Sequence, residues 1–162
     1  MTASKALELT PAGDRGIAVT RVFDAARARV FEALTEPGLL KRWLIGPHGW
    51  TMPVCEVDLR VGGALRIVWR GNDGAEMGMS GVYREITPPG RIAHTELFDA
   101  DWTGGETLVT NVLTEQDGRT TVTMTILYAT REVRDAILRS GMERGLAASY
   151  DRLAELLAPS GA

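Results

Sequence analysis

Short alternating segments separated by strong turn signals fill residues 51–128 and constrain the fold more than any other feature of the chain. The separators are Asn72-Asp73-Gly74, Pro88-Pro89-Gly90, Gly104-Gly105 and Asp117-Gly118. Such residues tolerate the backbone conformations of tight turns. Parallel neighbours would need long crossover connections, so these short links predict an antiparallel sheet.

One face of the first hairpin is expected to be bulky and apolar. In residues 65–70 the odd positions are Leu65, Ile67 and Trp69, while two of the three even positions are arginines. Successive side chains of a strand point to opposite faces, so the three large residues share one face. The returning segment adds Met77 and Met79 to it. This surface is either ordinary core or one wall of a pocket for an apolar ligand.

The segments before the sheet predict a strand and two short helices. Residues 1–15 are expected to form a flexible tail, and residues 16–23 alternate as a first strand. Asp24 is a candidate N-cap for a helix that carries Val30, Phe31 and Leu34 on one face. Pro37 fits the first turn of a second helix, which carries Trp43.

One long helix is predicted over residues 131–158, followed by a short tail at 159–162. Thr130 can cap it, and apolar residues recur at three- to four-residue spacing along it. Arg134 falls on the side expected to face water. Gly141 and Gly145 lie inside the predicted helix, where glycine is unfavourable, and indicate a close approach or extra space beside the helix.

Composition indicates one soluble globular domain, which we assign to residues 16–158. The length of 162 residues suits a single core. A net charge of −3 without a basic stripe argues against nucleic acid as a partner. No apolar run is long enough to span a membrane. The single cysteine, Cys55, precludes an internal disulfide and is expected to be a buried structural thiol in a cytoplasmic protein.

Five segments in order carry a resemblance to a known family. They are VFEALTEPGLLKRWLIGP, EVDLRVGGALRIVW, GVYREITPPGRI, GRTTVTMTI and GMERGLAASYDRLAELLA. With them the chain resembles the activator-of-heat-shock-protein-ATPase-homologue branch of the START-like (SRPBCC, Bet v 1-like helix-grip) superfamily. The resemblance implies an α+β fold in which a curved antiparallel sheet wraps around the long C-terminal helix, with an elongated cavity between them.

The resemblance also implies a range of functions. Relatives bind lipids, sterols, polyketides or other apolar molecules, a few lineages are cyclases or hydrolases, and one branch includes a co-chaperone domain. Two departures from the family pattern concern the cavity. This chain has Leu146 where relatives often carry tryptophan, which would enlarge the space. It has His94 and Glu96 where large apolar residues are usual, which would make the wall more polar.

The candidate ligand-binding residues follow from the inward faces of the strands and of the helix. Methionine adapts its shape to varied apolar ligands. The alternative is that these residues pack together as core. The set is Trp43, Leu65, Ile67, Trp69, Met77, Met79, His94, Glu96, Phe98, Asn111, Met124, Tyr128, Met142 and Leu146.

His94 and Glu96 are the weak catalytic candidates, since they stand two residues apart on one face of a strand. Facing inward, they can act as general acid and base or bind the polar end of a ligand. The alternative is a solvated pair at a wet sheet edge. His48 is expected in a loop at the cavity mouth, without a catalytic role. The two histidines and the cysteine are too far apart for a metal site, and no cofactor is expected.

Three functions therefore remain open. The first is binding of a small hydrophobic or amphipathic ligand between sheet and helix. The second is a co-chaperone-like interaction module, for which the sequence offers little. The third is a cyclase- or hydrolase-like enzyme that uses His94 and Glu96. A homodimer is also compatible with the sequence, through exposed strand edges or through Trp50 and Trp102.

Overall fold

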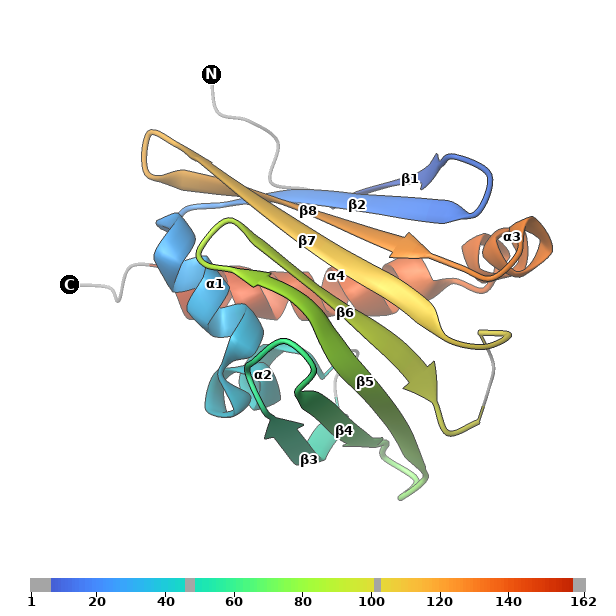
Figure 1. The fold of residues 1–162 in the computed structure, drawn as a ribbon. Coiled ribbons are helices and arrows are strands. Elements are labelled where there is room, and N and C mark those ends of the chain that lie inside the picture. Colours follow the sequence, from blue (N-terminus) through green and yellow to red (C-terminus); the bar gives the residue numbers. More distant parts are fainter. Residues whose placement is uncertain (1–6, 46–48, 101–102, 159–162) are drawn as a thin grey trace.

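A computed structural model describes residues 7–45, 49–100 and 103–158 of the chain (Figure 1). The elements, in chain order, are β1 (Glu8–Ala12), β2 (Gly16–Phe23), α1 (Arg27–Thr35), α2 (Pro37–Trp43), β3 (Thr51–Val57), β4 (Ala64–Arg70), β5 (Glu76–Thr87), β6 (Arg91–Phe98), β7 (Thr107–Gln116), β8 (Arg119–Leu127), α3 (Arg131–Arg139) and α4 (Met142–Leu157).

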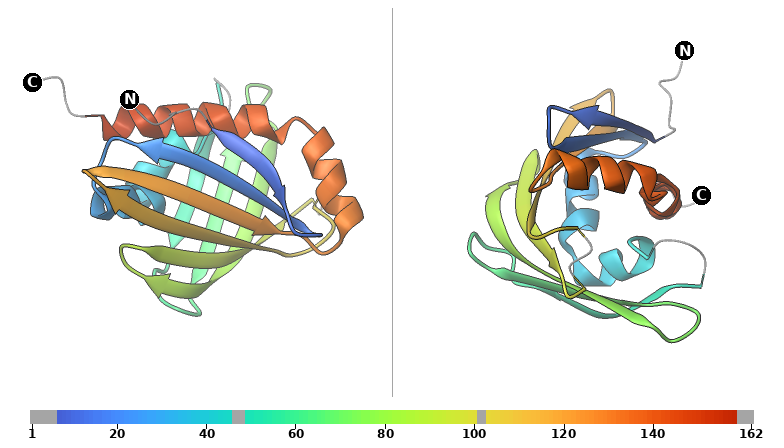
Figure 2. Two further views of the ribbon diagram at one scale, coloured as in Figure 1. Left: turned by 90° about the horizontal axis from the view of Figure 1, so that it is seen from above. Right: turned by 90° about the vertical axis from the view of Figure 1, so that its right-hand side faces the viewer.

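The strands form one antiparallel sheet, which confirms the prediction from the short turns. Their order across the sheet is β1-β2-β8-β7-β6-β5-β4-β3. The sheet curves, and α4 lies along its concave side, as Figure 2 shows from two further directions. The α+β helix-grip fold expected from the resemblance is therefore present.

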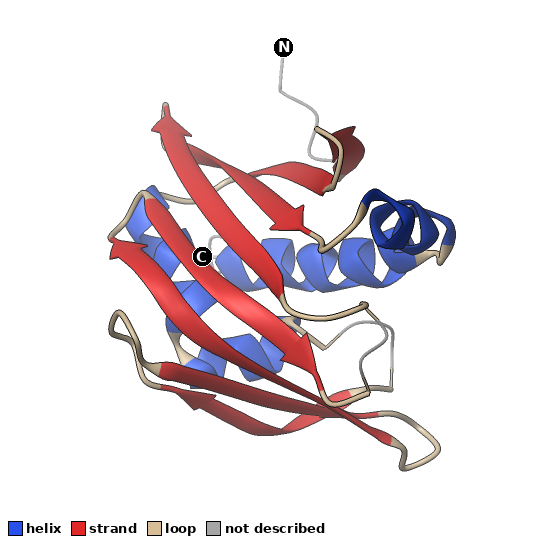
Figure 3. Ribbon diagram, turned by 45° about the vertical axis from the view of Figure 1, so that its right-hand side comes forward, coloured by secondary structure: helices blue, strands red, loops and turns tan. Residues whose placement is uncertain are grey.

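The two short helices close the concave side below α4. Figure 3 shows α1 and α2 on the same side of the sheet as α4, and α2 contacts both α4 and β3. Aromatic side chains join these parts: the ring of Tyr150 on α4 lies 5.8 Å from that of Phe23 and 5.9 Å from that of Trp43. The core of the molecule thus lies between the sheet and the helices.

A bend between β5 and β6 shapes the concave face. Their register shifts between Tyr83 and Glu85, and such a bulge bends a strand and increases its twist. Gly81 permits the close approach of the two strands, because a Cβ atom there would overlap the carbonyl oxygen of Thr95. The Thr95 hydroxyl accepts a hydrogen bond of 3.0 Å from the amide of Val82.

The predicted flexible tail over residues 1–15 is wrong for the strand that begins at Glu8, while residues 1–6 lie outside the described part of the chain. Residues 8–12 form β1, which pairs with β2 from Glu8 opposite Thr20 to Ala12 opposite Gly16. The side chain of Arg134, expected to face water, is instead buried and donates hydrogen bonds to the carbonyl oxygens of Gly13 and Gly16. These non-local hydrogen bonds connect the β1–β2 turn to α3, and the periodicity of the sequence does not predict them.

The predicted single C-terminal helix is two helices. The helical conformation is interrupted at Gly141, whose φ of 84° lies in the left-handed region that favours glycine. Gly141 is also the N-cap residue of α4. The hydroxyl of Ser140 donates to the carbonyl oxygen of Ile137 at the end of α3. Gly141 therefore ends a helix and begins another, while Gly145 lies within α4.

Asp24 is not the N-cap of the first helix, because α1 begins later, with Ala26 as its cap residue. Alanine has no side-chain acceptor for the free amides of the first turn. The carboxylate of Glu115 on β7 supplies one instead, accepting a hydrogen bond of 2.7 Å from the amide of Arg27. The cap is thus a tertiary contact rather than a local one.

A buried arginine joins β2 to α4 and leads to a stability prediction. Arg21 is 8% exposed, and its Nη1 lies 2.7 Å from the Asp151 carboxylate, whose side chain is 69% exposed. Removing the acid leaves a buried cation without its partner, whereas an apolar replacement of the arginine removes the need for one. We expect Asp151→Ala to lower the free energy of unfolding by about 1–2 kcal/mol, less than for a fully buried pair because water reaches the carboxylate.

The matched variant is Arg21→Met, which we expect to keep the free energy of unfolding within about 1 kcal/mol of the wild type. Urea denaturation of the two variants and of the double variant measures both effects. A loss in Arg21→Met as large as that in Asp151→Ala would show that the ion pair itself stabilises the fold.

Candidate functional site

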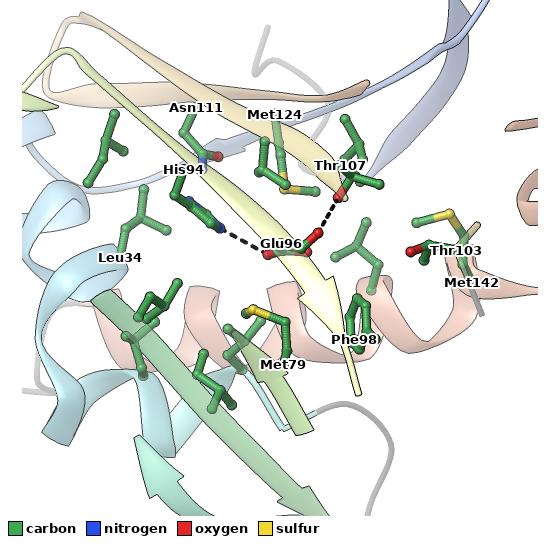
Figure 4. A pocket seen from close by; sticks show the side chains of 18 of the residues that line it. Leu34, Met79, His94, Glu96, Phe98, Thr103, Thr107, Asn111, Met124 and Met142 are labelled. Atoms are coloured by element: carbon green, nitrogen blue, oxygen red, sulfur yellow. Dashed lines mark hydrogen bonds and ion pairs between the residues drawn. The ribbon is translucent and has the colours of Figure 1, made fainter. Parts of the chain in front are cut away.

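A cavity of about 230 Å³ lies between the concave face of the sheet and the helices (Figure 4). A single water molecule needs only about 10–15 Å³, so the space suits a larger guest. The sheet contributes one wall, and α1, α2 and α4 contribute the other. The lining residues are Leu34, Leu40, Trp43, Leu44, Leu65, Ile67, Trp69, Met79, Tyr83, Ile92, His94, Glu96, Phe98, Thr103, Thr107, Val109, Asn111, Met124, Ile126, Tyr128, Met142, Leu146 and Tyr150.

The structure brings together all but one of the residues expected to bind a ligand. Those that line the cavity are Trp43, Leu65, Ile67, Trp69, Met79, His94, Glu96, Phe98, Asn111, Met124, Tyr128, Met142 and Leu146. Met77 does not, which corrects that prediction. It is half-buried opposite Trp69, near the β4–β5 turn.

Several lining residues were not expected, and two of them had a usable signal. Tyr83 continues the alternation that includes Met79, and Tyr150 belongs to the apolar stripe of the last helix. Leu34, Leu40 and Leu44 depend on how α1 and α2 dock below α4, which their own sequences do not encode. His48 and Trp102 lie outside the described residues.

Two tryptophans are held in place by hydrogen bonds to helix carbonyl groups. The indole N–H of Trp43 donates to the carbonyl oxygen of Ala33 at 2.8 Å, and that of Trp69 donates to Leu44 at 2.7 Å. The Trp69 ring stacks on Phe98 with ring centroids 6.2 Å apart. Both indoles have thus used their only donor within the protein, so they offer ring faces to a guest.

His94 and Glu96 form a hydrogen-bonded pair inside the cavity rather than at a wet edge. His94 Nε2 and Glu96 Oε2 are 2.9 Å apart, and their side chains are 14% and 23% exposed. Both project from β6, which lies between β5 and β7 in the sheet. The Tyr83 ring meets the His94 ring edge-on at 6.0 Å. Figure 4 shows the pair side by side below Asn111.

Asn111 is the second polar feature of the cavity. It projects from β7, is 6% exposed, and stands opposite Ile92 on one side and Met124 on the other. Its Oδ1 atom is buried without a hydrogen-bond partner in the described part of the chain. Buried polar atoms of folded proteins normally have a hydrogen-bond partner, so the Asn111 amide has an acceptor that is free to bind a donor.

Burial shifts the acidity of the tyrosines around the cavity. Desolvation raises the pKa of Tyr83 to about 12, with a smaller contribution from Cys55. It raises the pKa of Tyr128 to about 12 as well, with the Glu96 charge adding to the effect. Burial also raises the pKa of Tyr150, while Arg21 opposes the shift. All three tyrosines of the chain are therefore held in the neutral form.

These shifts predict a loss of stability in alkali. Because the folded pKa values exceed those of the unfolded chain, the native state retains its protons when the unfolded state loses them. The contribution is complete below the unfolded pKa of about 10, and it is lost as the pH rises through about 12. We expect the tyrosinate absorbance of the native protein to stay low at a pH between these values, and to appear on unfolding in urea. Titration of the native protein like free tyrosine would contradict the burial of these rings.

The described residues hold no group of three or more His, Cys, Asp or Glu side chains placed to bind a metal ion. None of the described helices is long and apolar enough to cross a membrane. Cys55 is half-buried on β3, where burial raises its thiol pKa and Lys41 opposes the shift. A thiol of raised pKa is a poor nucleophile, which agrees with a structural role.

The curved sheet that wraps around the C-terminal helix, with a cavity between them, defines a START-like (SRPBCC) domain of the helix-grip class. The profile of the family described as Activator of Hsp90 ATPase homolog 1-like protein matches residues 24–158. The chain belongs to this family, as its sequence motifs indicated.

Solved structures of bacterial proteins agree with this assignment. A protein from Rhodobacter sphaeroides is 37% identical, with a TM-score of 0.89 over 94% of this chain and 98% of its own. A protein from Nitrosomonas europaea is 26% identical, with a TM-score of 0.80 over 91% and 96% of the two chains. One from Chromobacterium violaceum is 28% identical, with a TM-score of 0.79 over 90% and 99%. No protein with a curated description matches the chain.

Proposed function

We propose that this domain binds a small hydrophobic or amphipathic molecule in the cavity between the sheet and α4. The observation that carries the proposal is the cavity itself, about 230 Å³ of space lined mainly by aliphatic, aromatic and methionine side chains. Ligand sites commonly combine such an apolar lining with a few polar groups that orient the guest. Here those groups are His94, Glu96 and Asn111.

The apolar lining is the expected source of affinity. Burying apolar surface contributes about 25 cal/mol per Å², from which the entropic cost of binding is subtracted. The anchored rings of Trp43 and Trp69 need little further ordering when a guest arrives. Met79, Met124 and Met142 can adapt their shape to it. This combination supports binding of a compact apolar group rather than of a highly charged one.

The proposal is tested by a ligand screen with matched variants. Small apolar and amphipathic compounds are screened by thermal shift and native mass spectrometry, and the affinity of each hit is measured by calorimetry. Met79→Ala removes cavity wall, and Met77→Ala makes the same change two residues away on β5, outside the cavity. We expect about a tenfold loss of affinity in Met79→Ala and no change in Met77→Ala.

Met79 is 1% exposed, so its variant can lose stability. Trp69→Ala, at a half-buried position of the same wall, therefore serves as a second cavity variant. A hit whose affinity is unchanged in both Met79→Ala and Trp69→Ala binds elsewhere. If every hit behaves so, the proposed site is wrong.

A second candidate function is general acid–base catalysis, and the His94–Glu96 pair favours it. The two groups lie 2.9 Å apart and face a cavity large enough for a substrate. A histidine oriented by a carboxylate is a common way to move a proton at a reacting atom. Incubation of cavity ligands with the wild type and with His94→Gln, followed by mass analysis, tests it. An unchanged ligand after prolonged incubation with the wild type leaves binding as the function.

A further inference from the structure

We propose that the guest of this cavity is a neutral amphiphile whose polar end is a hydroxyl group, an alcohol or a phenol, held by Asn111, His94 and Glu96. This inference rests on the proposed binding function and adds the chemistry of the head group. It follows from three observations: where the polar side chains stand, which hydrogen-bonding capacity they leave open, and which charges the cavity lacks.

The three polar side chains form one cluster on the sheet wall. His94 and Glu96 are two residues apart on β6, so both lie on its inward face. Asn111 projects from the neighbouring strand β7. His94 pairs with Val109 and Ile92 pairs with Asn111, so the imidazole and the amide are diagonal neighbours. Figure 4 shows the Asn111 amide above the His94 ring, with the Glu96 carboxylate beyond it. His94 thus lies between the amide of Asn111 and the carboxylate of Glu96, to which it is hydrogen-bonded.

The Asn111 amide has unused hydrogen-bonding capacity. Its Oδ1 is buried and has no partner among the described residues, although the side chain lines the cavity. Rotation about the last side-chain bond exchanges the oxygen and the nitrogen, so the amide can present an acceptor or a donor to a guest. A hydroxyl group can pair with either orientation of the amide, because it donates one hydrogen bond and accepts others.

The charge of the lining selects against an acidic head group. Glu96 is the single acidic residue among the lining residues, and neither lysine nor arginine occurs among them. A carboxylate or phosphate guest would approach the Glu96 charge with no fixed cation to offset its own desolvation. Fatty acids and phosphorylated lipids are therefore disfavoured.

An ammonium head group is a poorer match than a hydroxyl. It could donate to the carboxylate of Glu96 and to Oδ1 of Asn111, but burying a cation in a cavity lined mainly by apolar side chains carries a desolvation cost that a neutral hydroxyl does not pay. With Glu96 ionised, Nε2 of His94 donates to the carboxylate over the 2.9 Å contact. The carboxylate keeps a second oxygen for the guest. A guest hydroxyl that donates to this second oxygen makes a charge-assisted hydrogen bond, which is stronger than a neutral one.

The opposite wall defines the rest of the guest. Leu34 on α1, Leu40 on α2 and Leu146 on α4 line the helical wall of the cavity, and none of them offers a hydrogen bond. The stacked rings of Trp69 and Phe98 also line the cavity. A flat or compact apolar body, with a hydroxyl at the end that meets β6 and β7, satisfies both walls together.

The test uses three probes with one ring system: naphthalene, naphthol and naphthoate, the last two substituted at the same ring position. Affinities for the wild type, measured by calorimetry, give the head-group preference directly. We expect naphthol to bind at least about tenfold more tightly than naphthalene or naphthoate. The proposal is overturned if naphthoate or naphthalene binds as tightly as naphthol.

Two variants assign the preference to the cluster. Asn111→Leu keeps the size of the side chain and removes the amide, so naphthol should lose its advantage over naphthalene while naphthalene binds at least as well as before. It should also raise the melting temperature, because it removes a buried carbonyl without a partner. Glu96→Gln removes the charge, so naphthoate should gain affinity. A naphthol preference unchanged in Asn111→Leu would overturn the role of the cluster.

The outcomes separate this inference from the function on which it rests. If all three probes bind with equal affinity, the cavity is supported as a ligand site, and the preference for a hydroxyl head group is overturned. If none of the three binds while the wider screen gives hits that depend on Met79 and Trp69, the hydroxyl preference is overturned and the cavity remains a ligand site. Tight binding of naphthol alone, lost in Asn111→Leu, supports both.

Discussion

Leu146→Trp is expected to weaken ligand binding strongly while the domain stays folded. Leu146 projects from α4 into the cavity, and an indole ring in its place would occupy the space that a guest needs. We expect the affinity for any cavity ligand to fall at least about tenfold, equivalent to about 1.4 kcal/mol. Overpacking of a full core is unfavourable, but here the added volume enters existing space. The melting temperature should therefore be equal to or above that of the wild type.

The control is Leu146→Met, which keeps the volume and the apolar character of the side chain. Its affinity for the same ligand should stay within about threefold of the wild type. Calorimetry and thermal unfolding on the three proteins provide both readouts. A Leu146→Trp protein that is folded and binds as tightly as the wild type would place the ligand outside this cavity.

Leu153→Ala is expected to have the largest effect on stability of the variants considered. Leu153 is on α4 and fully buried, at 0% exposure, whereas Leu146 is half-buried beside the cavity. Deleting a leucine side chain from a filled core costs the transfer free energy and leaves a new void. We expect Leu153→Ala to lower the free energy of unfolding by about 3 kcal/mol or more.

Leu146→Ala is the matched substitution on the same helix. Space already exists beside it, so little packing is lost, and we expect a loss of about 1 kcal/mol or less. Urea denaturation compares the two variants. Equal losses would mean that the space beside Leu146 is as well filled as the core around Leu153, which would argue against an open cavity.

Local patterns in the sequence predicted most of the sheet. The alternation over residues 16–23 gives the observed bounds of β2, because that strand has one buried and one less buried face. The turn residues predicted the antiparallel order of β3 to β8. The inward direction of Leu65, Ile67 and Met79 followed from the same period, which is why the sheet wall of the site was predicted well.

Tertiary contacts account for what the sequence did not predict. The β1 strand depends on pairing with β2 and on bonds from Arg134, and the α1 cap depends on Glu115 from β7. The break at Gly141 was visible only as an unfavourable glycine in a helix, and its left-handed φ shows why that residue is there. Met77 was wrongly predicted to line the cavity, because alternation shows which face of a strand a residue is on but not which residues of that face border a cavity.

The same limit applies to the polar cluster. The i, i+2 spacing of His94 and Glu96 placed both on one face, but the choice between a wet edge and an interior wall depended on the position of β6 in the sheet. Asn111 was a candidate without an assigned partner. Its register opposite Ile92 brings it next to His94, and that neighbour follows only from the pairing of β6 with β7.

Methionine methyl NMR would locate a bound guest directly, because methionines of this chain lie both in the cavity wall and outside it. Met79, Met124 and Met142 line the cavity, while Met52 and Met77 do not. With methyl-labelled protein and saturating naphthol, we expect cross-relaxation between the ligand ring protons and the methyl groups of Met79, Met124 and Met142, and none to Met52 or Met77. Ligand contacts at Met77 or Met52 in place of the cavity methionines, or no contacts at any of the five, would contradict ligand binding in this cavity.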